Sequence, residues 1–266
     1  MIGLPRLIKR TGRHVYHTTG FTKSAILEIC AKLREMQPAP KATGRKPALS
    51  LFNSVVISLT YLRCNRVQQE LAETYDVSQS TISRVIAAMT VLLEHVLHDW
   101  VPTADDLDPN QQLIVDGTLL PCWSWSGHRE LWSGKHRTTG LTVQVACTLD
   151  GVLAWISDPL PGNAHDMKAL RESGFLDVDT DIQHLADKGY IGSDMLTPYR
   201  KPPGGELLEW QKEYNAAVNR VRAAIERVIA NLKTWRILHT DYRRPLHTFT
   251  NTISTVIALE FYRESF

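Results

Sequence analysis

The sequence predicts an α+β protein, with an all-α N-terminal part followed by a mixed sheet flanked by helices. Up to about residue 100, apolar residues recur at the three- and four-residue spacing of helices. Beyond an acidic, proline-containing stretch (101–111), short apolar runs and a hairpin turn appear instead. We therefore expect a basic arm, helix and linker over 1–48, a helical domain over 49–103 and a mixed-sheet domain over 110–266.

The first fifty residues contain an arm, a helix and a linker. Residues 1–20 show no sustained period, so we expect a flexible arm, and 22–36 has the pattern of an amphipathic helix. The following linker contains Gly-Arg-Lys-Pro, which loosely resembles an arm that inserts into a DNA minor groove. Arg45 and Lys46 are therefore candidate DNA contacts, although a plain linker explains them as well.

A long apolar helix is expected over 49–63, followed by two helices joined by a tight turn. The first of the pair covers 68–75, and the turn falls at Asp76-Val77. Ser78 is a suitable N-cap, since its hydroxyl accepts a hydrogen bond from a free backbone N–H of the next helix. Ile82 and Ile86 then face the core.

This pattern resembles the helix-turn-helix of many DNA-binding proteins, so 49–103 is expected to be a helix-turn-helix domain. In that motif the first residues of the second helix enter the major groove. The corresponding side chains here are polar or cationic and suited to base edges or phosphates: Gln79, Ser80, Thr81, Ser83 and Arg84. The alternative is a helical hairpin that binds nothing.

The second half alternates strand and helix patterns. Short strands are expected to end in Asp116 and Asp187, and Asp150-Gly151 marks a hairpin turn. Helices are expected to start near His165 and to cover 221–235 and 247–264.

Charge is distributed unevenly along the chain, although the net charge is only +2. Residues 1–50 carry ten Lys or Arg against two acids, whereas 101–200 carry seven against fourteen. A basic arm favours a polyanion through counterion release, but an acidic centre repels one unless cations bind there. Nucleic acid together with a divalent metal satisfies both halves, and a solvated basic tail is the alternative.

Several other classes are disfavoured. The four cysteines occur singly, without zinc-ribbon spacing or a disulfide framework. The chain contains no GxSxG, P-loop or HExxH motif. Its start lacks the features of a secretory signal, and no apolar run approaches the length of a membrane-spanning helix, so we expect a cytoplasmic location.

Three acids form the candidate catalytic and metal-binding set: Asp116, Asp187 and Glu226. Acids at adjacent strand ends can converge at one edge of a sheet, where a packed helix can present a third. Such clustered acids repel one another and partly protonate unless a cation neutralises them, and Mg²⁺ or Mn²⁺ prefers oxygen ligands. Two such ions about 4 Å apart activate an attacking hydroxyl and stabilise the leaving oxygen of a phosphodiester. Alternatively, the aspartates are turn acids and Glu226 pairs with Arg222.

Two further segments carry candidate residues. His165 and Asp166 either act near the site, as an accessory acid or DNA contact, or cap a helix. The segment 121–137 contains Trp123, Trp125 and Trp132 among basic residues. These rings either stack on unpaired bases or belong to the core.

The order of the three acids resembles the DDE triad of cut-and-paste transposases. "DKGY" at Asp187 is similar to the motif around the second acid of bacterial insertion-sequence transposases. Arg222-x3-Glu226-x6-Lys233 is similar to the signature around their third acid, with Asn219 at a position where those enzymes have Tyr. "PGNAHD" (161–166) resembles a segment of the Harbinger-like branch.

The resemblance implies an RNase H-like catalytic domain that cuts DNA at element ends and joins the 3′-ends to a target. Arg222 and Lys233 would then lie near bound phosphates, with Asn219, His165 and Asp166 close by. The implied partners are double-stranded DNA, both terminal inverted repeats and target, and further copies of the chain on that DNA. Two alternatives stay open: a catalytically inactive DNA-binding regulator, and a metal-dependent DNA endonuclease without strand transfer.

Overall fold

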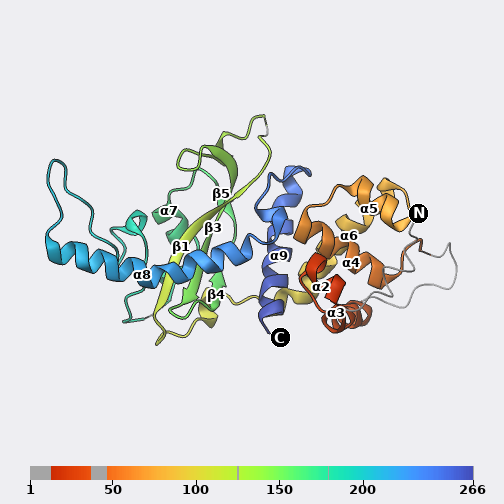
Figure 1. The fold of residues 1–266 in the computed structure, drawn as a ribbon, viewed down its shortest axis with the longest axis horizontal. Coiled ribbons are helices and arrows are strands. Elements are labelled where there is room, and N and C mark those ends of the chain that lie inside the picture. Colours follow the sequence, from red (N-terminus) through yellow and green to blue (C-terminus); the bar gives the residue numbers. More distant parts are fainter. Residues whose placement is uncertain (1–12, 37–46, 125, 179, 266) are drawn as a thin grey trace. The chain divides into compact units, whose positions relative to one another are not determined.

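The computed structural model describes residues 13–36, 47–124, 126–178 and 180–265 (Figure 1). The chain divides into two compact units. The helical unit comprises the described residues up to 101 together with 234–240 and those from 244 onward. The sheet unit comprises the described residues of 102–233 together with 241–243. The α+β class predicted from the sequence is confirmed.

The helical unit is built around α6, which contacts α3, α4, α5 and α9. The predicted helix at 22–36 is confirmed, and its apolar face is buried. Arg13–Thr19 forms a short helix where the sequence predicted an arm, because seven residues are too few to establish a period. The helices of this unit are α2 (Arg13–Thr19), α3 (Lys23–Met36), α4 (Leu51–Cys64), α5 (Gln68–Tyr75), α6 (Gln79–Leu97) and α9 (Phe249–Glu264).

The last helix, α9, is part of the helical unit and packs against α6. In α9, the buried hydroxyl of Thr255 donates to the carbonyl of Thr90 in α6 at 2.9 Å. Glu260 of α9 accepts a hydrogen bond from the indole of Trp235 at 2.6 Å. The structure therefore differs from the predicted range 110–266 for the second domain. Because α9 is buried on most sides, its sequence pattern does not indicate which unit covers it.

The α5–α6 pair has the expected turn. Asp76 adopts the left-handed conformation with φ 51°, and the Ser78 hydroxyl accepts from the Thr81 N–H at 3.2 Å. Ile82 and Ile86 are fully buried, which fixes the orientation of α6. The first turn of α6 is consequently left open to solvent on its other side.

One segment of the described chain, Gln79–Asp106, is long and apolar enough to span a membrane by length and composition, with mean hydropathy 1.4. This corrects the expectation that no run reaches that length. The core helix of a protein in water can pass the same test, and α6, which lies in this segment, packs against four helices.

In the sheet unit, the long strand β3 lies at the centre (Figure 1). It pairs antiparallel with β1 on one side, and β2, β5 and β4 pair antiparallel with it as well. Gly151, with φ 86°, forms the predicted turn between β3 and β4. The elements are β1 (Leu113–Pro121), β2 (Trp132–Ser133), β3 (Thr138–Thr148), β4 (Leu153–Ile156), β5 (Leu160–Pro161), α7 (Asp166–Glu172) and α8 (Glu209–Leu232).

The core of this unit includes a cluster formed by β1, β3 and α7. Val115, Ala146 and Leu170 are fully buried in it, beside Trp155 and Tyr190. Helix α8 contacts both β1 and β3, and its buried residues include Ala224, Ile225 and Val228. The four cysteines are free, as expected.

Two predicted strands differ from those observed. β1 continues past Asp116 to Pro121, so this acid lies within the strand instead of at its end. The strand expected to run into Asp187 is reduced to bridges at Leu185, which pairs in parallel with Ile114. The N–H of Val115 donates to the carbonyl of Leu185, and the N–H of Leu185 to that of Leu113, both at 2.8 Å.

Candidate active site

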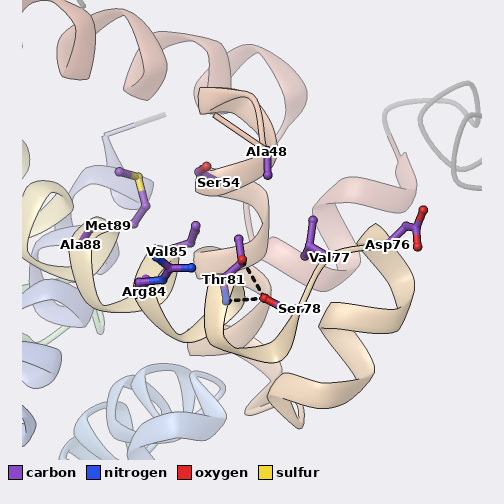
Figure 2. Close-up of a pocket in the computed structure, with 10 residues that line it drawn as sticks. All are labelled: Ala48, Ser54, Asp76, Val77, Ser78, Thr81, Arg84, Val85, Ala88 and Met89. Atoms are coloured by element: carbon purple, nitrogen blue, oxygen red, sulfur yellow. Dashed lines mark hydrogen bonds between the residues drawn. The ribbon is translucent and has the colours of Figure 1, made fainter. Parts of the chain in front are cut away.

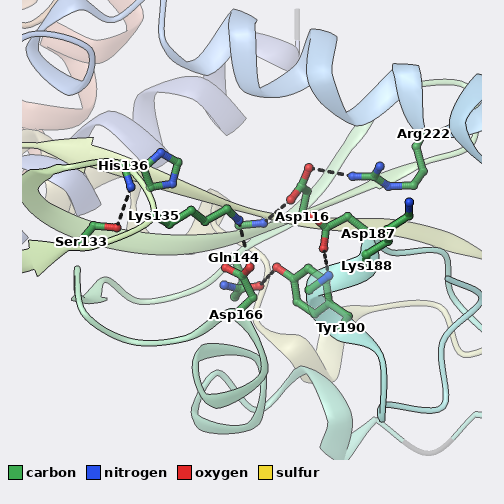
Figure 3. A network of polar contacts seen from close by, with 12 residues as sticks. Asp116, Ser133, Lys135, His136, Gln144, Asp166, Asp187, Lys188, Tyr190 and Arg222 are labelled. Atoms are coloured by element: carbon green, nitrogen blue, oxygen red, sulfur yellow. Dashed lines mark hydrogen bonds and ion pairs between the residues drawn. The ribbon is translucent and has the colours of Figure 1, made fainter. Parts of the chain in front are cut away.

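The parallel bridge places Asp116 and Asp187 side by side. Each acid follows its bridge residue, Ile114 or Leu185, by two positions, and in parallel pairing equal offsets keep residues adjacent. Figure 3 shows the two carboxylates close together, and the charge of Asp187 acts on the pKa of Asp116. The convergence expected from the sequence therefore arises from one bridge between the two segments.

Asp116 is held by a cation and a backbone amide. Arg222 of α8 donates to its carboxylate at 3.0 Å, and the Gly117 N–H donates to it at 2.8 Å. Burial raises the pKa of Asp116 to about 6, with Arg222 opposing and Asp187 adding to that shift. Any additional positive charge nearby would therefore stabilise the ionised form of Asp116.

Asp166 joins this group from α7. Its carboxylate accepts a hydrogen bond from Lys135 at 2.9 Å, and its side chain is 20% exposed (Figure 3). His165 occupies the N-cap position but is exposed and makes no capping hydrogen bond through its side chain. Asp166 thus lies beside Asp187 and also in the first turn of α7, and its role in the site stays a prediction.

Close packing around two glycines brings the acids together. A Cβ on Gly189 would lie 2.6 Å from Asp166 Oδ2 and 2.8 Å from Asp187 Oδ1. A Cβ on Gly117 would lie 3.2 Å from Asp166 Oδ1 and 3.1 Å from the Tyr190 hydroxyl. A side chain at position 189 would therefore collide with the acids, and one at position 117 would fit only if its neighbours shifted by a few tenths of an ångström.

Tyr190 and Gln144 form the buried floor of the site. The Tyr190 hydroxyl donates to Gln144 Oε1 at 2.6 Å, and burial raises its pKa, with the three aspartates adding to the shift. Tyr190 consequently stays protonated. We assigned no role to Gln144 from the sequence, but a glutamine within the apolar run "LTVQVAC" is a signal of a buried polar contact.

Glu226 is exposed, and the described charges that act on the pKa of Asp116 are those of Arg222, Asp187 and Lys135. Its spacing of four residues from Arg222 and seven from Lys233 places all three on one face of α8. Arg222 pairs with Asp116 instead of Glu226, so the i,i+4 ion pair of the alternative interpretation is not observed. Asn219, one turn before Arg222, is exposed.

Lys233 ends α8 beside the loop that carries Lys135. Burial lowers the pKa of His136, and the charges of Lys135 and Lys233 lower it further, so these three groups lie near one another. Burial also lowers the pKa of Lys233. Of these three groups, Lys135 is the one that pairs with a carboxylate of the site, that of Asp166.

The carboxylates suit a hard divalent cation, because carboxylate oxygens are the ligands that Mg²⁺ and Mn²⁺ prefer. In the structure, positive charge is supplied by two side chains of the protein. Arg222 pairs with Asp116, and Lys135 pairs with Asp166. Within the described residues, no three His, Cys, Asp or Glu side chains are gathered closely enough to hold a metal. The donor chemistry fits a divalent metal, and the acids would have to exchange partners to bind it.

The candidate DNA-reading residues lie at the start of α6. Gln79, Ser80 and Arg84 are exposed, whereas Thr81 and Ser83 are half-buried. Ser78, Thr81 and Arg84 line a pocket of about 760 Å³ between α4 and α6 (Figure 2). Arg45 and Lys46 lie outside the described residues.

Two of the three tryptophans are on the surface of the sheet unit. Trp123 is 51% and Trp132 49% exposed, so neither is a core residue, and Trp125 lies outside the described residues. The Arg243 guanidinium lies 5.5 Å from the ring centre of Trp123. Base stacking by these rings stays a prediction.

Comparison with known families agrees with this arrangement. The model of the DDE superfamily endonuclease family matches residues 115–260, and that of its helix-turn-helix matches residues 47–99. The chain belongs to the DDE superfamily of transposases. The first match spans all three predicted acids, and the second spans α4, α5 and α6 in full. Endonucleases of this superfamily generally use divalent metal ions.

Two curated relatives are transposases of insertion sequences. The chain is 32% identical over 197 residues to the putative transposase of element IS112 from Streptomyces albus G, covering 73% of each. It is 25% identical over 252 residues to the probable transposase of element IS702 from Microchaete diplosiphon, covering 88% of each. No solved structure matches the chain.

Proposed function

We propose that this DDE-superfamily protein is an active DNA transposase that cuts phosphodiester bonds at element ends and joins the 3′-hydroxyls to target DNA. The observation that carries the proposal is the pairing of Asp116 with Asp187 by the Ile114–Leu185 bridge. Two carboxylates held side by side are costly unless positive charge offsets them, and Arg222 offsets this only in part, since burial and Asp187 still raise the pKa of Asp116. A protein that only bound DNA has no physical need for such a cluster.

The residues divide the work as follows. Asp116 and Asp187 hold Mg²⁺ or Mn²⁺, and Glu226 completes the set from the face of α8 that carries Arg222. Two bound ions supply the activation of the attacking hydroxyl and the neutralisation of the leaving oxygen. Arg222 and Lys233 hold phosphates of the DNA backbone. The Arg222 guanidinium can bind a phosphate through two N–H groups, and the Lys233 ammonium acts as a single point charge.

Recognition of the element ends is assigned to the start of α6. Its exposed polar residues suit major-groove base edges, and Arg84 suits a base or phosphate. The partners are the terminal inverted repeats and the target duplex, with several copies of the chain assembled on DNA. The cytoplasm, at the nucleoid in a bacterial cell, is the corresponding location.

A reconstituted reaction tests this function. The purified full chain is incubated with a duplex carrying the element's terminal repeats, a supercoiled target and Mg²⁺, and cleaved and joined products are separated on gels. We expect both products from the wild type. Asp116→Asn, Asp187→Asn and Glu226→Gln should each reduce both products by about 100-fold or more, because metal ions supply several kcal/mol of transition-state stabilisation.

Glu213→Gln is the matched control, since Glu213 is another exposed glutamate of α8. Cleavage without joining would assign the chain to the endonuclease alternative. DNA binding without either product would identify a catalytically inactive regulator. Full activity in any of the three acid variants would contradict the assignment of that acid.

A further inference from the structure

The ion pair between Asp166 and Lys135 has a geometry that the proposed three-acid set does not explain. Asp166 belongs to α7 and Lys135 to the loop between β2 and β3, and their charged atoms are 2.9 Å apart. The Lys135 ammonium also feels the charges of Asp187 and Asp116, which raise its pKa together with Asp166 against the opposing effect of burial. The Lys135 ammonium thus interacts electrostatically with all three carboxylates.

The carboxylate of Asp166 lies next to that of Asp187. Asp166 Oδ2 and Asp187 Oδ1 lie 2.6 Å and 2.8 Å from one point, the Cβ position that Gly189 lacks. Two carboxylates at this separation repel each other, and the repulsion is relieved when one carboxyl is protonated or when a positive charge lies beside them. Lys135 provides that charge in the structure (Figure 3).

An independent feature indicates a ligand at the same place. Gln144 is fully buried, and its Nε2 has no hydrogen-bond partner among the described residues. Nε2 lies 3.1 Å from the Cβ position that Gly117 lacks, and Asp166 Oδ1 lies 3.2 Å from the same position. A buried donor without a partner is costly, so this group is suited to an acceptor oxygen brought in with a bound ion.

We propose that Asp166 is a fourth carboxylate of the metal centre and that Lys135 occupies its oxygen until a divalent cation displaces the ammonium. The proposal rests on the proposed function, because Asp116 and Asp187 must hold the metal beside it. Lys135 is 55% exposed at its side chain, so it can leave without rearrangement of the core. Once released, its ammonium is available to a DNA phosphate.

Calorimetric titration of the full chain with Mn²⁺, in the absence of DNA, tests this exchange. The melting temperature at millimolar Mn²⁺ serves as a second measure of metal binding that detects weak affinity. We expect Asp166→Asn to weaken Mn²⁺ binding by about 10-fold or more. Lys135→Met should tighten it by about two- to fivefold, because the metal no longer competes with a partly exposed ion pair.

The double variant distinguishes competition for Asp166 from general charge repulsion. If Lys135 competes for that carboxylate, Lys135→Met gives no gain in affinity when Asp166→Asn is already present. If it acts only by repulsion, the gain is the same in both backgrounds, and the proposal is overturned. Lys135→Gln is a second variant should Lys135→Met fold poorly in metal-free buffer.

Matched controls come from the exposed ion pair Lys168–Glu172 on the same helix. Lys168→Met and Glu172→Gln should leave Mn²⁺ affinity unchanged. Wild-type affinity in Asp166→Asn, with binding lost in Asp187→Asn, would overturn this proposal and leave the proposed function standing. Unchanged affinity in Asp187→Asn, or no binding by the wild type, would contradict both.

Discussion

Individual contacts decide the chemistry of the site at the scale of single residues. Arg222 and Lys135 each bind one carboxylate, and Gln144 holds the buried Tyr190. The absent side chains of Gly117 and Gly189 are as important, because they allow carboxylates from separate segments to approach one another.

Gly189→Ala tests the close approach of the acids. The new Cβ would lie within 3.0 Å of oxygens of Asp166 and Asp187, so at least one carboxylate must move. Since a displacement of about 1 Å in a reacting group can cost about 100-fold, we expect DNA cleavage to fall by roughly 10- to 100-fold. Gel-based cleavage rates provide the measurement.

Gly134→Ala is its control, because a Cβ at Gly134 meets no atom within 4 Å and the residue adjoins Lys135. This variant should cut DNA at the wild-type rate. Wild-type cleavage by Gly189→Ala would show that the spacing of these two carboxylates does not matter for the reaction.

At the scale of elements, local sequence signals were reliable where the chain itself determines the structure. The Ser78 cap, the turn at Asp76 and the hairpin at Gly151 all depend on neighbouring residues, and all were predicted. The bridge of Leu185 and the length of β1 depend on pairing with distant segments, which local periodicity does not encode. The location of α9 was missed for the same reason.

The first turn of α6 is expected to read DNA. Arg84→Ala should weaken binding to the terminal repeats by about fivefold or more and reduce the salt dependence, because one cationic contact is lost. Fluorescence anisotropy at several salt concentrations measures both effects. Arg34→Ala, an exposed arginine on α3, is the control, and equal affinities for the two variants would place recognition elsewhere.

The stability of the sheet unit is expected to depend on pH through the contact of β1 with His184. His184 Nδ1 accepts the Leu113 N–H at 3.2 Å, and burial lowers the pKa of this imidazole below its usual 6.5. The folded protein therefore favours the neutral ring. The unfolded chain binds the proton more readily, so stability is retained above pH 6.5 and is lost as the pH falls below it.

His184→Asn keeps an acceptor for Leu113 and removes the titrating group. Between pH 7 and pH 5, the melting temperature of the wild type should fall more than that of the variant. Parallel curves for the two proteins over this range would exclude His184 as the cause.

At the scale of the whole molecule, the order of acids and motifs along the chain predicted that distant acids would meet, which the pattern of no single element predicts. Asp116 and Asp187 were predicted to converge, and the structure places them together. Glu226 was assigned from spacing, yet it is exposed, and within the described residues no three acids lie closely enough to hold a metal. The pairing of Lys135 with Asp166 and of Gln144 with Tyr190 could not be predicted, since these partners are distant in sequence and such contacts leave no local pattern.

The central claim is that Asp116 and Asp187 share a divalent cation. Anomalous diffraction from crystals of the full chain grown with Mn²⁺ and a terminal-repeat duplex tests it directly. We expect a manganese peak about 2.0–2.2 Å from a carboxylate oxygen of each aspartate. A peak bound to neither residue, in crystals whose DNA has been cut, would contradict it.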